Sequence, residues 1–280
     1  MCIFTGDATV LDSVRGTAIF AGARADGRQV LAYRMTVAAR EPVAMVLPLP
    51  VPPAGPEDAV RFIDLSGYGE LFDDLHRAFP QPVSGTVSLG FAPQAASRAP
   101  TLVVHSVGAF VASFVPTRAD FSRLDPRFGL SDAVWDALPQ YADWGFAVFQ
   151  LHDAPRRRWV DRLLGRWPVP PPRTIHPMAF EFPRRDPREL FFPTVHVHDG
   201  AVHPEAHFDH TLYAQLQPGR VPAGPDWEPS GQPLSDAVDV ARSAGVVAPG
   251  EPGYRRRILG PHPNRDTLVG SVEHGPGSGR

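Results

Sequence analysis

Short apolar segments separated by Gly and Pro dominate the first half of the chain and predict β-strands. Residues 18–23 and 29–37 are apolar segments on either side of Asp26-Gly27, a pair typical of a two-residue hairpin turn. Residues 43–49 form another apolar segment, which ends in a run of prolines. The pattern predicts an antiparallel hairpin followed by a third strand.

Helical spacing is confined to a few short segments. Apolar residues across 68–79 recur at the spacing of one helix face. Ser131 precedes Val134, Trp135 and Leu138 and predicts a capped helix that ends at Pro139. Pro56, followed by two acidic residues, predicts the start of another short helix.

The remaining pattern predicts an α+β fold, mainly antiparallel β-sheet with a few short helices. Strands do not alternate regularly with long helices, which argues against a doubly wound parallel sheet. Residues 217–280 are rich in Pro, Gly, Asp and Arg and predict an irregular Pro/Gly-rich C-terminal tail. We therefore expect one α+β domain over 1–216, or two β-rich halves, 1–98 and 99–216. Further strands are predicted at 86–91, 101–106, 109–115, 145–151, 178–182 and 190–198, and a strand or helical turn at 210–216.

Composition excludes several classes of function. Hydrophobic residues make up 43% of the chain and the net charge is −3, with no basic stripe interleaved with aromatic residues, so we expect no nucleic-acid partner. The sequence contains no Lys, which excludes Schiff-base and pyridoxal phosphate chemistry and P-loop NTPases. No apolar stretch is long enough to span a membrane, and no signal peptide is visible. We expect a cytoplasmic protein.

Cys2 is the single cysteine of the chain, so it cannot form an internal disulfide. If Met1 is removed, the mature chain carries a free amine and a thiol on one residue. The amine could then act as the base for a thiol nucleophile, or the thiolate could bind a metal ion. The alternative is that Cys2 is a small buried hydrophobic residue at the start of a strand.

A histidine-rich segment supplies the second candidate for chemistry. His196 and His198 are two residues apart, so on a strand both rings point to one side. Asp199-Gly200 then turns the chain, and His203, His207 or His210 could supply a third ring. Glu205 could serve as an acid or base beside a metal-bound water. The alternative is that these are exposed loop histidines that make only hydrogen bonds.

Taken together, these residues predict a metal-dependent enzyme. One thiolate, Cys2, and the imidazoles of His196 and His198 suit copper or zinc, and iron less well. We expect a small-molecule substrate and favour an oxidoreductase over a hydrolase. An N-terminal-nucleophile amidohydrolase at Cys2 and a non-catalytic metal-binding protein remain alternatives. The sequence does not fix the oligomeric state.

A cluster of arginines is a weaker candidate site. Arg184, Arg185 and Arg188 stand beside Asp186 and Glu189 and predict a solvated surface whose charges pair with one another. The functional alternative is a clamp for a carboxylate-bearing substrate, since guanidinium groups bind carboxylates through paired hydrogen bonds.

Two resemblances to known families follow from particular residues. The start Met1-Cys2 resembles the N-terminal-nucleophile hydrolases, both the class II glutamine amidotransferases and the bile-salt hydrolase and penicillin acylase group, which implies Cys2 as nucleophile. Ile3-Phe4 replaces the Gly-Ile of the amidotransferases, and the long helices of that fold are missing from the pattern. Residues 2–200 also resemble an uncharacterised family of bacterial proteins with a cysteine near the mature N-terminus, a resemblance that supplies no function. It rests on the segments 15–20, 43–51, 107–115, 145–151 and 177–182.

Overall fold

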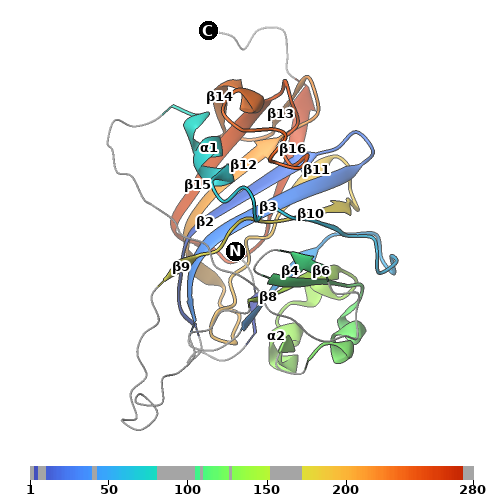
Figure 1. The fold of residues 1–280 in the computed structure, drawn as a ribbon. Helices are drawn as coiled ribbons and strands as arrows, with labels where there is room; N and C mark the ends of the chain where they lie inside the picture. The colour runs from blue at the N-terminus through green and yellow to red at the C-terminus, as the bar shows by residue number, and fades with distance from the viewer. Residues whose placement is uncertain are drawn as a thin grey trace.

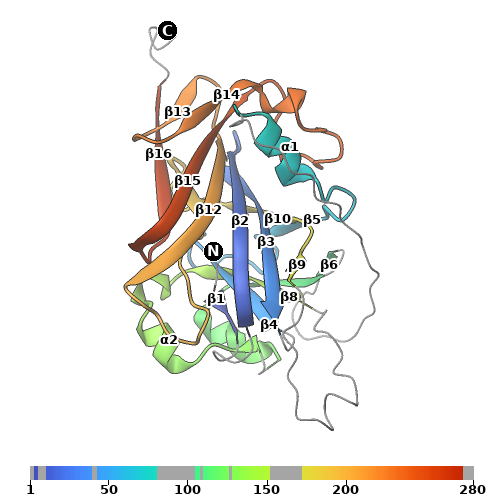
Figure 2. The ribbon, with the colours of Figure 1, turned by 90° about the vertical axis from the view of Figure 1, so that its left-hand side faces the viewer.

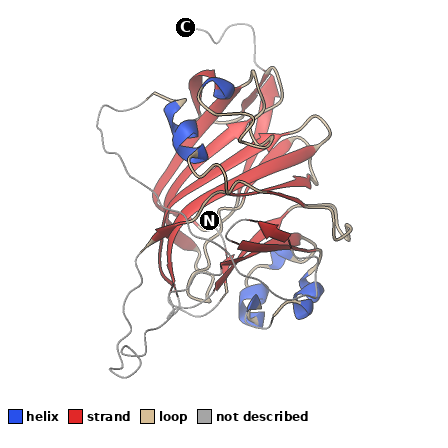
Figure 3. Ribbon diagram, in the orientation of Figure 1, coloured by secondary structure: helices blue, strands red, loops and turns tan. Residues whose placement is uncertain are grey.

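The structure of the protein is a computed structural model that describes residues 3–5, 11–39, 43–80, 105–107, 110–125, 128–151 and 172–273. Within these residues the protein is mainly β, antiparallel pairing dominates and the helices are short (Figure 3). A search of these ranges finds no helix with the length and apolar character needed to cross a membrane.

The largest sheet has eight strands and contains the predicted hairpin near its centre (Figures 1 and 2). Its strands are β2 (Leu11–Ala23), β3 (Arg28–Ala39), β5 (Arg61–Ile63), β9 (Arg173–Thr174), β10 (Met178–Pro183), β12 (Glu205–Gln215), β14 (Glu228–Pro233) and β15 (Pro252–Pro263). They follow the order β14-β15-β12-β2-β3-β10-β5, with β9 beside β3. Gly27 has a φ of +84° in the hairpin turn, a conformation that glycine adopts without strain. β12 pairs antiparallel with β15 and parallel with β2, so it joins the two ends of the chain in one sheet.

A second sheet has five strands and packs against the first. Its strands are β1 (Ile3–Phe4), β4 (Val43–Leu49), β6 (His105–Val107), β7 (Phe110–Val115) and β8 (Gly145–Leu151). Their order is β1-β4-β8-β7-β6, and all the pairs are antiparallel. Every residue of β4 is buried, because both faces of this strand are covered.

A third, small sheet lies beside the first. It consists of β11 (Glu189–Phe192), β16 (Thr267–Glu273) and β13 (Arg220–Pro222), in that order. The buried side chain of Gln29 on β3 connects this sheet to the large one. Gln29 Nε2 donates to Phe191 O at 2.7 Å, and Phe191 N donates to Gln29 Oε1 at 3.0 Å. These two bonds satisfy a buried amide with the backbone of β11.

The main hydrophobic core lies between the two larger sheets. Ile19, Leu31 and Tyr33 of the large sheet meet Met45 and Phe149 of the five-stranded sheet there, and each is fully buried. Burial of each such side chain contributes about 1.5–3 kcal/mol to folding. These contacts hold the two larger sheets together.

Short helices cover the outer face of each of these sheets. The helix α1 (Leu71–Arg77) packs Leu71, Phe72 and Leu75 on Phe20 of the large sheet. The outer face of the five-stranded sheet is covered by η1 (Arg118–Arg123), α2 (Asp132–Asp136) and η3 (Pro139–Tyr141). The described residues therefore form four layers, helix, sheet, sheet and helix (Figures 1 and 2).

Several predicted elements are confirmed. The hairpin at Asp26-Gly27 forms, and β4 and β8 have the predicted bounds 43–49 and 145–151. Ser131 caps α2, since its side chain accepts a hydrogen bond from Val134 N at 3.4 Å. The prediction of a mainly antiparallel β protein is likewise confirmed.

Other predicted elements are wrong. The chain at Pro56 makes only a turn, in which Ala59 N donates to Pro56 O at 3.0 Å, because Arg61 already enters β5. The predicted strand 190–198 ends at Phe192, before Pro193, which lacks the N–H that a ladder requires.

The predicted irregular tail is also wrong for the part of it that the structure describes. Residues 220–273 contain β13, β14, β15 and β16, and β15 is the antiparallel partner of β12. The predicted strand 86–91 and residues 101–104 lie outside the described residues. The division into one domain or two halves stays a prediction.

Candidate functional site

Three of the five predicted histidines meet in the interior, and we call His196, His198 and His210 the histidine cluster. The ring centroids of His196 and His198 lie 5.2 Å apart and those of His196 and His210 lie 5.0 Å apart. Phe208 packs against His196 at 4.3 Å and Phe4 against His198 at 5.7 Å. The cluster therefore joins the segment after β11 to the first half of β12 and to β1.

Asn264 fixes the backbone of the cluster. Its Oδ1 accepts from His196 N at 2.7 Å, and its Nδ2 donates to His196 O at 2.9 Å and to His203 O at 2.8 Å. The residue next to His196, Val197, pairs with Ile3 in a parallel bridge, and Phe4 N donates to Val197 O at 3.0 Å. The chain at the cluster is thus held in an extended form between β1 and the turn after β15.

A buried carboxylate holds the residues just before the cluster. Asp266 Oδ1 accepts from Thr194 N at 2.8 Å and from Val195 N at 3.1 Å, while Tyr141 OH donates to Asp266 Oδ2 at 2.5 Å. Burial raises the pKa of Asp266, and the three donors oppose that shift in part. This network positions the cluster and is itself closed to solvent.

Burial keeps the histidine cluster neutral. Burial lowers the pKa of His196 to about 2 and that of His198 to about 4, and the charge that His198 would carry adds to the shift of His196. Burial, with the charges that His196 and His198 would carry, lowers the pKa of His210 well below its ordinary value. Within the described residues, His196 Nε2, His198 Nε2 and both ring nitrogens of His210 have no hydrogen-bond partner.

The other predicted site residues lie elsewhere. His203 is exposed and its Nε2 lies 2.8 Å from Asp199 Oδ2. His207 and Glu205 are exposed on the face of β12 opposite His210. Cys2 lies outside the described residues, so its roles as ligand and as nucleophile stay predictions.

The predicted function as a metal-dependent enzyme is wrong. In the ranges that the structure describes, no group of three or more His, Cys, Asp and Glu side chains could hold a metal ion. The rings of His196 and His198 stack, with their planes 21° apart and their centroids 5.2 Å apart. The prediction of a copper or zinc oxidoreductase is therefore wrong as well. Cys2 lies outside the described residues, so a copper or zinc ion bound through it stays a prediction, as does catalysis of another kind.

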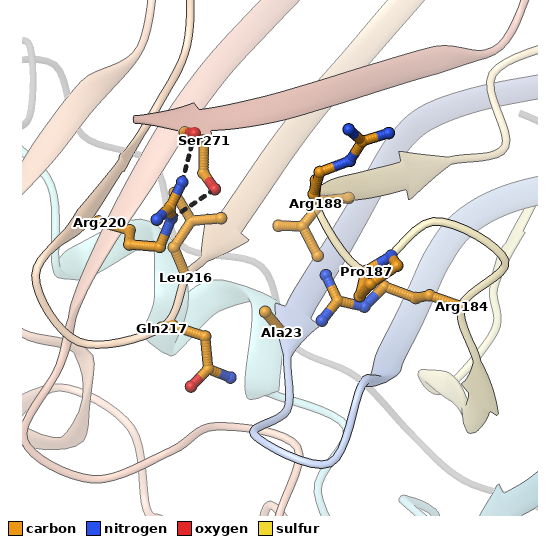
Figure 4. Close-up of a pocket in the computed structure, with 9 residues that line it drawn as sticks. Ala23, Arg184, Pro187, Arg188, Leu216, Gln217, Arg220 and Ser271 are labelled. Carbon is orange, nitrogen blue, oxygen red and sulfur yellow. Dashed lines mark hydrogen bonds between the residues drawn. The ribbon is translucent and has the colours of Figure 1, made fainter. Parts of the chain in front are cut away.

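A pocket at the other end of β12 is a second candidate site (Figure 4). It is a half-open pocket of about 260 Å³ between the first hairpin, the turn before β11 and the small sheet. Its lining residues are Ala23, Arg184, Pro187, Arg188, Leu190, Leu216, Gln217, Arg220 and Ser271. We call this the arginine pocket.

Two of its guanidinium groups are held by neutral oxygen atoms. Arg220 Nε donates to Ser271 Oγ at 2.8 Å and Arg220 Nη2 to Ser271 O at 2.7 Å. Arg184 Nε donates to Gly27 O at 3.2 Å and Arg184 Nη1 to Glu189 O at 3.3 Å. These bonds leave Arg220 Nη1 and Arg184 Nη2 without an acceptor among the described residues. Each of those nitrogens carries two N–H donors.

The neighbouring arginines are neutralised by carboxylates. Arg188 Nη2 lies 2.6 Å from Asp186 Oδ2, and its side chain points away from the pocket centre in Figure 4. Arg185 Nη1 contacts both oxygens of Asp143 at 3.0 and 3.1 Å, and Arg185 does not line the pocket. The predicted surface of mutually paired charges therefore describes Arg188, which pairs with Asp186. It does not describe Arg184, or Arg185, whose partner is Asp143.

Sequence reasoning missed Arg220 altogether. It lies on β13, a strand of three residues inside the segment predicted to be irregular. The available signal was the alternation of Arg220, Val221 and Pro222, which is too short to separate a strand from a loop.

Comparisons with known proteins supply no family for the chain. No protein-family model matches it, and neither does any curated protein. The resemblance to an uncharacterised bacterial family stays a prediction.

Solved structures of baculovirus P35 are similar to the chain. The crystal structure of P35 gives a TM-score of 0.45 at 13% identity, over 97% of this chain and 100% of P35. P35 in its complex with caspase-8 gives 0.41 at 9% identity, over 92% and 97% of the two chains. A mutated P35 after caspase cleavage gives 0.43 at 10% identity, over 91% and 99%. With every one of these TM-scores below 0.5, neither the fold nor the partner of P35 is carried over to this chain.

Proposed function

We propose that this protein binds a small anionic molecule in the arginine pocket. The observation that carries the proposal is the pair Arg184 and Arg220. Both guanidinium groups face one pocket, both are anchored by neutral oxygen atoms, and neither has an ion pair with a carboxylate among the described residues.

The environment of Arg184 supports an anionic occupant. Burial lowers the pKa of Arg184, and Asp186 and Asp26 oppose the shift only from a distance. A partly buried charge without a close counter-ion is unfavourable, and an anion in the pocket would remove that cost. The site is therefore more stable with a carboxylate or phosphate group bound than without one.

The anchoring of the two arginines supports binding further. Each guanidinium is held by two hydrogen bonds, so little side-chain freedom is lost when a ligand arrives. The free N–H donors are arranged for charge-assisted hydrogen bonds, which are stronger than neutral ones.

The lining residues favour binding over turnover. Among the described residues that line the pocket there is no His, Cys, Asp or Glu to act as a base or nucleophile, and Ser271 Oγ is engaged by Arg220. We therefore propose a binding protein, with the small-molecule partner and the cytoplasmic location that the sequence predicts.

A thermal unfolding assay tests the proposal. Succinate, butyrate and inorganic phosphate are titrated at constant ionic strength, with chloride as the balancing anion. We expect at least one of the three to raise the Tm in a saturable way, and the Arg220→Gln variant to need about tenfold more of it.

The matched control is Arg257→Gln, which removes the charge of an exposed arginine on β15 that does not line the pocket. Its response should equal that of the unaltered protein. The proposal is wrong if no probe raises the Tm or if the two variants respond alike.

A further inference from the structure

The two free cationic groups of the arginine pocket stand on opposite sides of it. Figure 4 shows Arg220 beside Ser271 on one side and the guanidinium of Arg184 reaching in from the other. Their anchors belong to different parts of the fold. Arg220 is held by β16, and Arg184 is held by the hairpin turn at Gly27 and by Glu189 of β11. The two charges therefore cannot move together onto one small ion without losing these bonds.

Apolar side chains occupy the space between the two charges. Ala23, Pro187, Leu190 and Leu216 line the pocket together with the arginines, and Figure 4 places Leu216 and Ala23 between the guanidinium groups of Arg220 and Arg184. Apolar walls favour methylene groups and disfavour a polar or charged middle section of a ligand. The pocket thus presents a charge, an apolar stretch and a second charge.

The pocket is larger than a single small ion. A volume of 260 Å³ holds roughly eight or nine water molecules at about 30 Å³ each. One carboxylate or one phosphate group fills a minor part of that volume. It would satisfy one guanidinium and leave the other without a counter-ion.

From this arrangement we propose that the ligand is a short aliphatic dicarboxylate, with one carboxylate on Arg220 and the other on Arg184. This inference rests on the proposed function, since it assigns a ligand class to the same pocket. Arg220 Nη1 and Arg184 Nη2 supply the donors, and the methylene chain lies along Leu216 and Ala23.

Calorimetric titration at constant ionic strength tests the ligand class. Succinate, glutarate and adipate scan the separation of the two carboxylates, and butyrate, valerate and caproate are the monoacids of matching chain length. We expect one diacid to bind about tenfold to hundredfold more tightly than its matching monoacid, the worth of one added charge-assisted contact.

Arginine variants show whether the preference for a diacid arises from the guanidinium groups of Arg184 and Arg220. Arg220→Gln and Arg184→Gln should each abolish the preference for the diacid over the monoacid, while Arg257→Gln keeps it. Because Arg184 anchors the hairpin turn, Arg184→Lys replaces it if the glutamine variant does not fold. The lysine keeps the charge but loses the planar donor pair, so it should reduce the preference in part.

The outcomes separate this inference from the proposed function. Equal affinity for diacids and monoacids, or tighter binding of inorganic phosphate than of every diacid, overturns the dicarboxylate and leaves anion binding in place. If none of the probes binds, both proposals fail. A diacid preference that survives in both arginine variants also overturns the inference.

Discussion

Nitrogen-bearing side chains have opposite environments in the histidine cluster and in the arginine pocket. In the cluster, burial removes the charge, and the ring nitrogens of His210 have no hydrogen-bond partner among the described residues, while its ring packs against His196 and Phe208. In the pocket, backbone oxygens support guanidinium groups that stay charged, and their remaining donors face open space. The difference teaches that density of titratable residues in the sequence does not locate a site. What matters is whether their polar atoms are directed at a space that a ligand can enter.

The largest effect expected from this contrast is a loss of stability at low pH. The pKa of His196 is lowered to about 2 and that of His198 to about 4, so below pH 6.5 the unfolded chain takes up protons that these two imidazoles do not bind in the folded chain. Stability is complete above pH 6.5 and is lost as the pH falls. At pH 5 the loss is about 2 kcal/mol for each of the two imidazoles, about 4 kcal/mol in total.

Urea unfolding at pH 7, 6 and 5 measures that loss. Asp266 acts in the opposite sense, because burial raises its pKa and its protonation favours the fold, so an Asp266→Asn background isolates the histidine contribution. A free energy of unfolding that stays flat from pH 7 to 5 in that background would show that the cluster is not buried.

Removal of the buried carboxylate should have the next largest effect. Asp266→Ala leaves Thr194 N, Val195 N and the hydroxyl of Tyr141 without their acceptor, and we expect a loss of about 3 kcal/mol in the free energy of unfolding. Asp266→Asn retains one acceptor oxygen and should lose less. Both variants should keep the rise in Tm that anions cause at the arginine pocket. Loss of that rise would mean that the histidine cluster and the arginine pocket are coupled.

Replacement of a cluster histidine by an aliphatic residue should raise the free energy of unfolding. His210 is 1% exposed and makes no hydrogen bond among the described residues, so His210→Leu removes two buried polar atoms at little change in volume. We expect a gain of about 1 kcal/mol at pH 7 and a shallower loss in acid. His203→Leu, at an exposed site, is the control and should change stability by less than about 0.5 kcal/mol. A destabilised His210→Leu would indicate that the ring nitrogens have a partner after all.

The smallest effect should come from a carboxylate beside the pocket. Asp186→Asn frees Arg188 and removes a negative charge near Arg184, so it should raise the affinity for anions by about twofold to fivefold, and less at high salt. Asp143→Asn is the matched control, because its partner Arg185 does not line the pocket. Calorimetric titration at two salt concentrations compares the two variants. An equal rise in anion affinity in Asp186→Asn and Asp143→Asn would show that the effect is one of net charge alone.

Runs of apolar residues predicted the centre of this fold well. β4 and β8 are buried on both faces, so continuous apolar composition identified them and their ends. The outer strands were missed for the opposite reason. β15 contains Pro252, Pro261 and Pro263 at its ends, positions that a ladder tolerates, and composition alone does not distinguish these from loop prolines.

The candidate sites show a similar limit. The two-residue spacing of His196 and His198 correctly placed both rings side by side, and His210 joins them through the alternation of β12. The sequence could not show that the rings stack in a closed interior, because that depends on Asn264 and Asp266 from a distant segment. Arg184 and Arg220 are brought together only by pairing of strands that lie far apart in the chain.

The parallel pairing of β2 with β12 sets an order of events during synthesis. Residues 17–22 cannot find their partners at 210–215 until most of the chain has left the ribosome, and β12 in turn waits for β15. Until then the edge of the first hairpin exposes an unpaired row of backbone groups, the arrangement that favours association with other chains. A chain truncated at residue 216 would therefore keep an open edge on β12.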